Sequence, residues 1–244
     1  MTAFQLDHLC FSYNGQRILN NLTGRIPKGS FLCLAGPSGI GKTTLLRLLA
    51  GLEQPDSGSL TLFGKPVVGP GRDRAVVFQQ DPLFPWMNVE KNVVFAIKCT
   101  QVVDKKTARL RAKTLLQQVG LAGEEKKYPC QLSGGMKQRA ALARALALNS
   151  EILLLDEPFG ALDPGTRQNM EQLLQNLWIK NRMTVVMVTH DLQEAVTLAD
   201  RIWILRDGRL EADLPMDLPR SEREIETIKQ ELQIRFFGNT EEQS

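Results

Sequence analysis

The chain has 244 residues, of which 43% are hydrophobic and 23% charged, and 30 basic against 27 acidic side chains give a net charge of +3. These values are typical of globular proteins and argue against a disordered, collagen-like or coiled-coil chain. The charge is too small to indicate a nucleic-acid-binding surface, so we expect no nucleic-acid partner. The four cysteines have no metal-ligand spacing, which favours free thiols in a reducing cytosol. Because we find no secretory signal and no apolar run of membrane-spanning length, we expect a soluble cytoplasmic protein.

Short apolar runs alternate with helical patterns along the chain. Four runs predict buried strands, at 31–36, 75–79, 151–158 and 184–190. Helices are predicted at 42–52, 105–120, 166–181 and 191–200. This alternation predicts an α/β fold with a mostly parallel core sheet.

Two β-hairpins are predicted beside this core. Asn14-Gly15 and Asp207-Gly208 are tight-turn signals, and each lies between alternating runs. The first hairpin predicts an antiparallel β portion at the N-terminus. The charge-rich segment after 214 contains an amphipathic stretch at 221–237, which predicts a short surface helix that packs back on the core.

A phosphate-binding loop is predicted between the strand at 31–36 and the helix at 42–52. The segment GPSGIGKTT matches the pattern G-x-x-x-x-G-K-[ST]. Its glycines let backbone N–H groups surround phosphate oxygens, and the helix N-terminus adds the positive end of its dipole. Lys42 provides a charge for the β- and γ-phosphates, and Thr43 a hydroxyl for Mg²⁺. We expect a nucleoside triphosphate to bind to Gly36, Pro37, Ser38, Gly39, Ile40, Gly41, Lys42, Thr43 and Thr44.

Two acidic residues follow the predicted strand at 151–158. Asp156 and Glu157 come after the apolar run ILLL, at the end of a strand where ligands of open α/β sheets bind. A carboxylate there can hold the Mg²⁺ that Thr43 touches, and a second can orient or deprotonate a water aimed at the γ-phosphate. We therefore assign Asp156 to the metal and Glu157 to the water.

The segment LSGGMKQR at 132–139 indicates a second anion-binding nest at a helix start, formed by Ser133, Gly134 and Gly135. One nucleotide does not need two such nests in one subunit. With this segment, the chain resembles the ABC (ATP-binding cassette) ATPase family from about residue 13 to 210. The resemblance implies an ATP-binding core with an inserted helical subdomain. It also implies that two cassettes enclose two ATP molecules head to tail, with Ser133, Gly134, Gly135 and Gln138 of one subunit facing the nucleotide of the other.

The resemblance implies further site residues. Tyr13 matches the aromatic residue that stacks on adenine, and the alternative is a tyrosine buried in a strand. Gln79 matches the glutamine that approaches Mg²⁺ and the attacking water, although Gln80 adjoins it. Asp163 matches the loop that crosses the dimer interface, and His190 the histidine that contacts the γ-phosphate and Glu157. The implied catalytic residues are Glu157, His190 and Gln79, and the implied metal ligands are Thr43, Gln79 and Asp156.

The same resemblance implies one ATPase domain over residues 1–244. Its core is expected at 1–80 and 150–214, its helical subdomain at about 81–149, and a C-terminal helical tail at 215–244. The interval 45–131 holds no long coiled coil, and neither a second cassette nor a fused membrane domain is visible. These features are typical of a separate importer subunit.

The stretch FQQDPLFPWMNVEKNVVFAIK at 78–98 resembles the glutamine-loop region of the nitrate, sulfonate and taurine importer group. Phe84, Trp86 and Met87 would form an exposed apolar patch on which a permease docks. The alternative is that Trp86 packs inside the helical subdomain.

The resemblance therefore implies the ATP-hydrolysing subunit of a bacterial ABC importer for a small nitrate-, sulfonate- or taurine-like solute, with ATP and Mg²⁺ as cofactors. The expected partners are a second, identical cassette, transmembrane permease subunits and a solute-binding protein. The expected location is peripheral, on the cytoplasmic face of the inner membrane. Two alternatives are a soluble ABC ATPase acting on a non-transport partner and a P-loop kinase, which leaves the nest at Ser133 unexplained.

Overall fold

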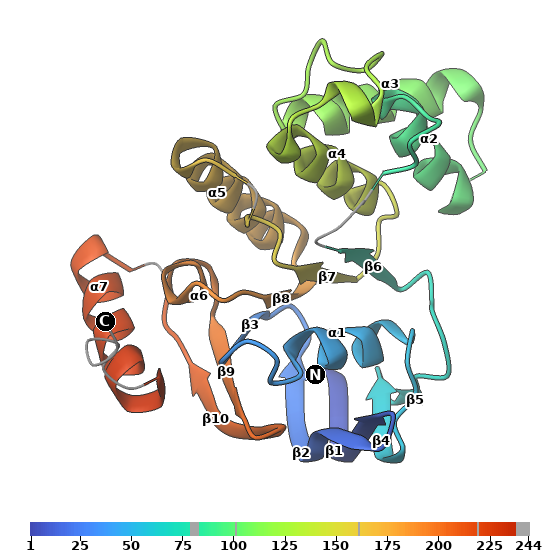
Figure 1. The fold of residues 1–244 in the computed structure, drawn as a ribbon. Coiled ribbons are helices and arrows are strands. Elements are labelled where there is room, and N and C mark those ends of the chain that lie inside the picture. The colour runs from blue at the N-terminus through green and yellow to red at the C-terminus, as the bar shows by residue number, and fades with distance from the viewer. Residues whose placement is uncertain (79–82, 101, 161, 219, 238–244) are drawn as a thin grey trace. The chain divides into compact units, whose positions relative to one another are not determined.

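The structure is a computed structural model that describes residues 1–78, 83–100, 102–160, 162–218 and 220–237. The chain divides into two compact units, and each is described by itself (Figure 1). The first unit comprises residues 1–71 and 182–244, and the second comprises residues 72–181.

The first unit contains both antiparallel and parallel strands. Its elements, in chain order, are β1 (Thr2–Tyr13), β2 (Gln16–Pro27), β3 (Phe31–Ala35), α1 (Lys42–Ala50), β4 (Ser57–Leu62), β5 (Lys65–Pro66), β8 (Thr184–Val188), α6 (Leu192–Leu198), β9 (Arg201–Arg206), β10 (Arg209–Pro215), α7 (Glu222–Leu232) and a π-helical turn, Gln233–Phe237.

The N-terminal strands form an antiparallel sheet in the order β2-β1-β4-β5. The turn between β1 and β2 has Asn14 at φ 49° and Gly15 at φ 82°, as expected for a tight hairpin. Phe4, Leu6 and Leu9 of β1 are at most 1% exposed, so one face of this sheet forms a hydrophobic core.

The parallel strands of the first unit are β9, β3 and β8, in that order, and β10 pairs antiparallel with β9 at the edge. All five residues of β3 and all five of β8 are buried. This explains why both read as continuous apolar runs rather than alternating ones. Leu34 is in register with Val188 of β8, so the carboxyl ends of β3 and β8 lie at the same sheet edge.

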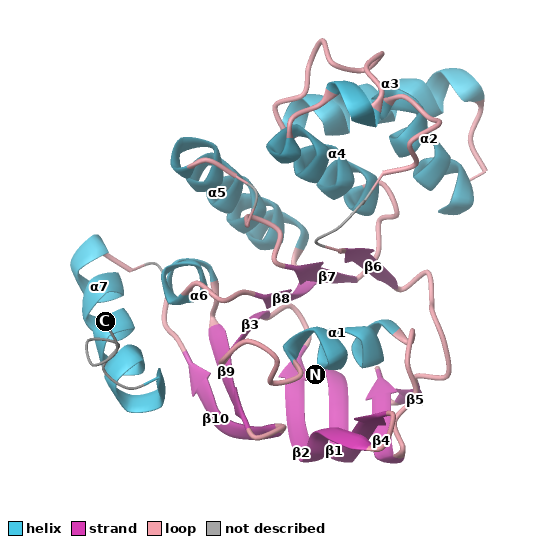
Figure 2. Ribbon diagram, in the orientation of Figure 1, coloured by secondary structure: helices cyan, strands magenta, loops and turns pink. Residues whose placement is uncertain are grey.

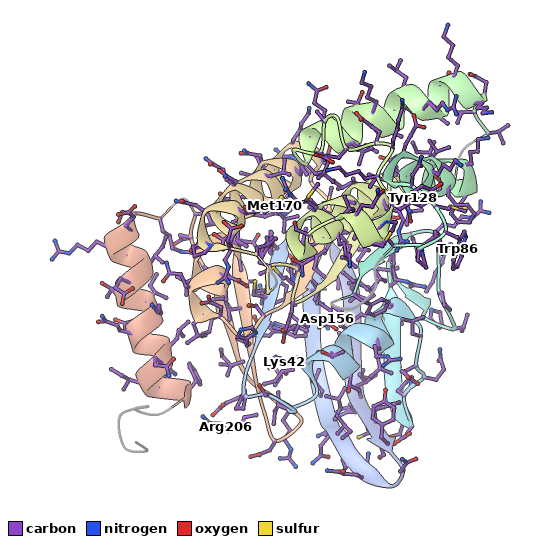
Figure 3. All side chains as sticks on the ribbon, turned by 45° about the horizontal axis from the view of Figure 1, so that its top comes forward. Lys42, Trp86, Tyr128, Asp156, Met170 and Arg206 are labelled. Atoms are coloured by element: carbon purple, nitrogen blue, oxygen red, sulfur yellow. The ribbon has the colours of Figure 1, made fainter. Side chains whose placement is uncertain are left out.

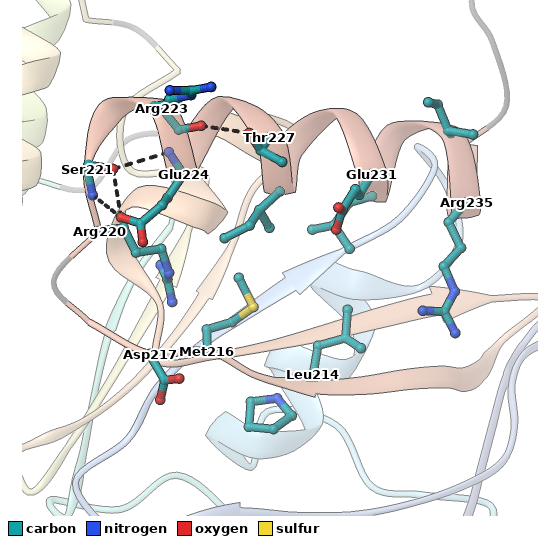
Figure 4. Close-up of a pocket in the computed structure, with 14 residues that line it drawn as sticks. Leu214, Met216, Asp217, Arg220, Ser221, Arg223, Glu224, Thr227, Glu231 and Arg235 are labelled. Atoms are coloured by element: carbon teal, nitrogen blue, oxygen red, sulfur yellow. Dashed lines mark hydrogen bonds between the residues drawn. The ribbon is translucent and has the colours of Figure 1, made fainter.

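The C-terminal helix α7 packs against α6, as the amphipathic stretch at 221–237 predicts. Ser221 caps α7: its hydroxyl accepts a hydrogen bond from the N–H of Glu224, while the Glu224 carboxylate accepts one from the Ser221 N–H (Figure 4). Between α7 and the end of β10 lies an open groove of about 1110 Å³, lined on the strand side by Leu214 and Met216.

The second unit combines a short parallel strand pair with helices. Its elements are β6 (Arg74–Val77), α2 (Val89–Thr100), α3 (Lys105–Gln118), a 3-10 turn (Pro129–Gln131), α4 (Gly134–Leu146), β7 (Ile152–Asp156) and α5 (Pro164–Asn181). Helices α2, α3 and α4 contact one another without an intervening strand (Figure 2). Ala108, Ala112 and Leu116 of α3 are fully buried, and the two small alanine side chains allow close helix packing.

The predicted α/β fold, with its antiparallel N-terminal portion and helical subdomain, is confirmed. The strand predicted at 75–79 is described as Arg74–Val77, and the helix predicted at 166–181 begins two residues earlier, at Pro164. The predicted subdomain boundaries stay a prediction: the compact second unit also includes β6, β7 and α5. Among the described residues, no helix is both long and apolar enough to cross a bilayer.

Candidate nucleotide site

The predicted phosphate loop joins β3 to α1, and two of its glycines lie where a side chain does not fit. Gly36 has φ +149°, and a Cβ there would lie 2.6 Å from the carbonyl oxygen of Leu205. Gly41, directly before α1, has φ +104°, and its Cβ would lie 2.9 Å from the Leu19 side chain. Both positions therefore require glycine for backbone conformation and for space.

Lys42 begins α1 and turns its side chain back into the loop. The residue is only 6% exposed, and Nζ donates hydrogen bonds to the carbonyl oxygens of Gly36 at 2.7 Å and Pro37 at 2.8 Å (Figure 3). The neighbouring Thr43 is exposed at the helix N-terminus. The loop thus combines a fixed ammonium group with the positive end of a helix dipole, an arrangement suited to phosphate.

His190 lies at the same edge of the first unit's sheet as this loop. It follows β8, and the N–H of Thr189 donates to the carbonyl oxygen of Leu34 at 3.4 Å. His190 itself is exposed, whereas Thr189 is 2% exposed. The parallel pairing of β3 and β8 therefore brings two predicted site segments together.

Glu194 is a site residue that the sequence analysis missed. It is 5% exposed and accepts a hydrogen bond of 2.6 Å from the Thr189 hydroxyl. That hydroxyl also accepts one from the N–H of Asp191 at 3.0 Å, so the turn that carries His190 is held from both sides. The available signal was an acidic residue among the apolar positions of the helix at 191–200.

Tyr13, at the end of β1, is 39% exposed and is therefore not a tyrosine buried in its strand. Its hydroxyl donates to Glu53 Oε1 at 3.1 Å. Glu53 is a second residue that the sequence analysis missed, because nothing in the local sequence marks it as a partner of Tyr13.

In the second unit, the predicted acidic pair lies at the end of β7. Asp156 is 7% exposed, and the next residue, Glu157, has a left-handed backbone with φ +46°. Such a conformation is uncommon outside glycine and is often found at functional sites. The parallel neighbour β6 ends at Val77, in register with Leu155, one residue before the end of β7. Gln79 and Gln80, which follow β6, lie outside the described residues.

The predicted signature begins α4. Ser133 caps this helix, accepting a hydrogen bond of 3.3 Å from the N–H of Met136, and both Ser133 and Gly134 are exposed. A Cβ on Gly135 would lie 2.7 Å from the Leu162 side chain. Gln138, by contrast, is 8% exposed, so its side chain does not share the exposed surface of Ser133.

Asp163 caps α5. Its side chain accepts a hydrogen bond of 3.0 Å from the N–H of Thr166. Hydrogen bonds from the backbone and side chain of Thr166 hold the pKa of Asp163 below its ordinary value. The carboxylate is exposed at the start of the helix, where it also complements the helix dipole.

Of the predicted apolar patch on the second unit, Trp86 is exposed, whereas Phe84 and Met87 are half-buried. Trp86 is 69% and Phe95 44% exposed, and the Phe84 ring centroid lies 5.5 Å from that of Trp86 and 5.2 Å from that of Phe95. The Arg144 guanidinium lies 5.0 Å from the Phe84 centroid. The alternative in which Trp86 is packed inside the subdomain therefore does not hold (Figure 3).

Asn92 organises the loop that carries this patch. The residue is fully buried; its Oδ1 accepts from the N–H of Phe84 at 2.8 Å, and its Nδ2 donates to the carbonyl oxygens of Phe84, Met87 and Asn88 at 3.0–3.2 Å. A single buried amide thus fixes the loop by satisfying several backbone groups.

Among the described residues, no group of three or more His, Cys, Asp and Glu side chains is arranged to hold a metal ion. Proteins bind Mg²⁺ through one or two carboxylates together with substrate phosphates and water rather than in an all-protein cage. The buried carboxylate of Asp156 and the exposed hydroxyl of Thr43 are oxygen donors of that kind.

A family model described as ABC transporter matches residues 19–160, more than half of the chain. The chain belongs to the ABC transporter family. It is 44% identical over 228 residues to the nitrate import ATP-binding protein NrtD of Synechocystis, covering 92% of this chain and 85% of the relative. It is 43% identical over 242 residues to the taurine import ATP-binding protein TauB of Escherichia coli O157:H7, covering 96% and 94%.

A solved structure of the ATP-binding cassette MJ0796, a post-hydrolysis dimer bound to ADP and Pi, matches with a TM-score of 0.81 and 31% identity, covering 88% of this chain and 100% of that one. These three matches cover 88–96% of this chain. The protein is thus an ATP-binding subunit with the ATPase activity, coupled to transport, that defines such subunits of the family.

Proposed function

We propose that this chain is the ATPase subunit of a bacterial ABC importer that takes up a small nitrate-, sulfonate- or taurine-like solute. The observation that carries the ATPase part of the proposal is the phosphate loop, in which Lys42 is held by two loop carbonyls at the same sheet edge as His190. The nitrate and taurine import relatives, similar over most of their length, support the importer class and the solute class.

In this proposal ATP binds with its adenine on Tyr13 and its phosphates on the loop from Gly36 to Thr44. Lys42 and the loop amides stabilise the charge of the γ-phosphate. Thr43 and Asp156, with Gln79, would hold Mg²⁺, which would neutralise phosphate charge.

Glu157 orients the attacking water and accepts its proton as the water oxygen bonds to the γ-phosphorus and the bond to the ADP oxygen breaks. His190 contacts the γ-phosphate and helps to hold it in line. The exposed start of α4 supplies Ser133, Gly134 and Gly135 to the nucleotide of a second, identical cassette, and Asp163 lies in the loop at that interface. Gln138 is part of the same proposed signature although its side chain is buried in the subunit described here.

The partners in this proposal are the second cassette, permease subunits and a solute-binding protein, and the subunit works at the cytoplasmic face of the inner membrane. The predicted patch of Phe84, Trp86 and Met87, extended by the neighbouring ring of Phe95, is the surface on which the permease docks. Its exposure and its rigid attachment through Asn92 support this, because apolar side chains held in place lose little entropy on binding.

The experiment is a pull-down of tagged Glu157→Gln protein from native membranes with Mg-ATP, with the bound proteins identified by mass spectrometry. Capture of a multi-span permease is the expected result, and a solute-binding protein in the same sample would direct the search for the solute. Capture of soluble proteins alone would contradict the importer function and favour an ABC ATPase that acts on a non-transport partner.

A further inference from the structure

Two contacts hold the Tyr13 side chain, one at its hydroxyl and one at its ring. Its hydroxyl donates to Glu53 Oε1 at 3.1 Å, and its ring meets the Phe11 ring at a centroid distance of 4.7 Å and an interplanar angle of 86°. Edge-to-face packing of this kind is favourable and directional. Tyr13 as a residue is nevertheless 39% exposed, so it stays open to a ligand.

Glu53 is itself fixed by the end of α1. Gly51 ends the helix, and the N–H of Leu52 donates to the carbonyl oxygen of Arg47 at 2.9 Å. Arg47, in the last turn of α1, places its Nε 3.7 Å from Glu53 Oε1. The carboxylate that receives the Tyr13 hydroxyl therefore follows α1 by three residues and has its charge partner, Arg47, on that helix.

The phosphate loop lies at the opposite end of the same helix. Lys42 is the first residue of α1, and the nine-residue helix is about 13 Å long. Helix α1 thus connects Lys42 of the phosphate loop with Arg47, the charge partner of Glu53. At its N-terminal end, Gly41 lies against Leu19, and Leu19 is the β2 partner of Phe11.

The protonation state of Tyr13 suits this hydrogen bond. Burial, followed by the hydrogen bond and the negative charge of Glu53, raises the pKa of the Tyr13 phenol above its ordinary value. The phenol therefore keeps its proton at neutral pH and acts as the donor.

We propose that Glu53 is a positioning residue for nucleotide binding: it orients the Tyr13 ring as the adenine platform, and Arg47 holds Glu53 in place. The inference rests on the proposed function, in which Tyr13 stacks on adenine. A ring that is ordered before ATP arrives loses less side-chain freedom on binding, so the orienting contact strengthens affinity for the base and not for the phosphates.

The test compares dissociation constants for ATP and for inorganic tripolyphosphate, which has phosphates and no base, by calorimetry. We expect Tyr13→Ala to weaken ATP binding about tenfold, since it removes the stacking surface. Glu53→Ala and Tyr13→Phe should each weaken it about threefold, and the double variant should be no weaker than either single variant. Tripolyphosphate binding should stay at the wild-type value in all of these variants.

Two further variants sharpen the comparison. Glu53→Gln keeps an oxygen that accepts the Tyr13 hydrogen bond, so it should recover most of the affinity lost in Glu53→Ala. Asp56→Asn changes an exposed acid three residues further along the chain and should leave both dissociation constants unchanged.

Each contrary result has a separate meaning. If Tyr13→Ala leaves the ratio of the ATP and tripolyphosphate dissociation constants unchanged, Tyr13 is not the adenine platform, and the proposed role of Glu53 is overturned as well. If Tyr13→Ala lowers ATP affinity but Glu53→Ala does not, only the positioning role is overturned. An equal loss for ATP and tripolyphosphate in Glu53→Ala would overturn it as well, because the residue would then support the fold generally.

Discussion

The Thr189 hydroxyl donates a 2.6 Å hydrogen bond to the buried carboxylate of Glu194, next to the exposed His190. The same hydroxyl accepts from the N–H of Asp191, whose own side chain caps α6 by accepting from Gln193 at 2.8 Å. The end of β8 and the start of α6 are thereby joined through one turn. The position of the His190 backbone is set by this network and not by the histidine alone.

Replacing Glu194 should impair the chemical step more than ATP binding. In Glu194→Ala the Thr189 hydroxyl loses its buried acceptor, which we expect to lower the free energy of unfolding by about 2 kcal/mol. We expect kcat to fall at least fivefold with a smaller change in KM, because the turn carries His190 and not the phosphate loop. Steady-state ATPase assays with Gln193→Ala, an exposed neighbour on the same helix, as control would check this. A proportional rise in KM with unchanged kcat would contradict it.

Much of the fold could be predicted because its signals lie in short segments. Asn14-Gly15 and Asp207-Gly208 both have positive φ in tight turns, and Asp191 caps α6 as expected from its place before an apolar helix. The pairing of β1 with β4, for instance Phe4 with Leu62, depends on residues far apart in sequence, and no local pattern reveals it.

The candidate site likewise contains residues that local sequence predicts and residues that it does not. The candidate phosphate loop and signature could be predicted because backbone geometry demands particular residues at fixed spacing, as at Gly36 and Gly41. Glu53, Glu194 and Asn92 could not, because each acts through one hydrogen-bonded partner that the fold brings near. A polar residue becomes a positioning group only when its partner's location is known.

Trp86→Ala should weaken capture of the permease without destabilising the subunit. The side chain is 69% exposed, so we expect the thermal midpoint to change by less than about 2 °C, whereas losing an aromatic anchor from an interface commonly costs tenfold or more in affinity. Asn92→Ala is the contrasting variant, because it leaves buried backbone groups unpaired and should destabilise the loop itself. Wild-type permease capture by Trp86→Ala would show that the patch has another role.

Arg220 attaches the C-terminal segment to α6. Its guanidinium donates to the carbonyl oxygens of Val196 and of Ala199, the latter at 3.1 Å, at the C-terminal end of α6 where a cation complements the helix dipole. We expect Arg220→Ala to lower the free energy of unfolding by about 1–2 kcal/mol. Limited proteolysis should cut the variant in the segment before α7 earlier than the wild type. Equal cleavage rates in both proteins would show that the α7 contacts hold the segment without Arg220.

The four cysteines should differ in reactivity with a maleimide at neutral pH. Cys33 is fully buried, and burial followed by the charges of Glu194 and Asp200 raises its pKa well above the ordinary value, so it should stay unlabelled until the protein unfolds. Cys99 and Cys130 are exposed and should react.

Cys10 should also react. Hydrogen bonds from the Asn21 N–H and the Ser57 side chain lower the pKa of its thiol, which raises the fraction of reactive thiolate at neutral pH. Peptide mapping by mass spectrometry checks whether Cys10, Cys99 and Cys130 are labelled before Cys33. Early labelling of Cys33 would mean that β3 opens to solvent in the native protein.

We expect that ATP held on the phosphate loop brings two cassettes together and that Glu157 is needed to hydrolyse it. The most direct measurement is the molar mass of Glu157→Gln protein by light scattering, with and without saturating ATP, beside Lys42→Ala, which removes the phosphate-binding ammonium. We expect Glu157→Gln to form a stable dimer only with ATP, with hydrolysis reduced at least a hundredfold, and Lys42→Ala to stay monomeric. A Glu157→Gln protein that remains monomeric in saturating ATP, or that hydrolyses ATP at the wild-type rate, would contradict the account.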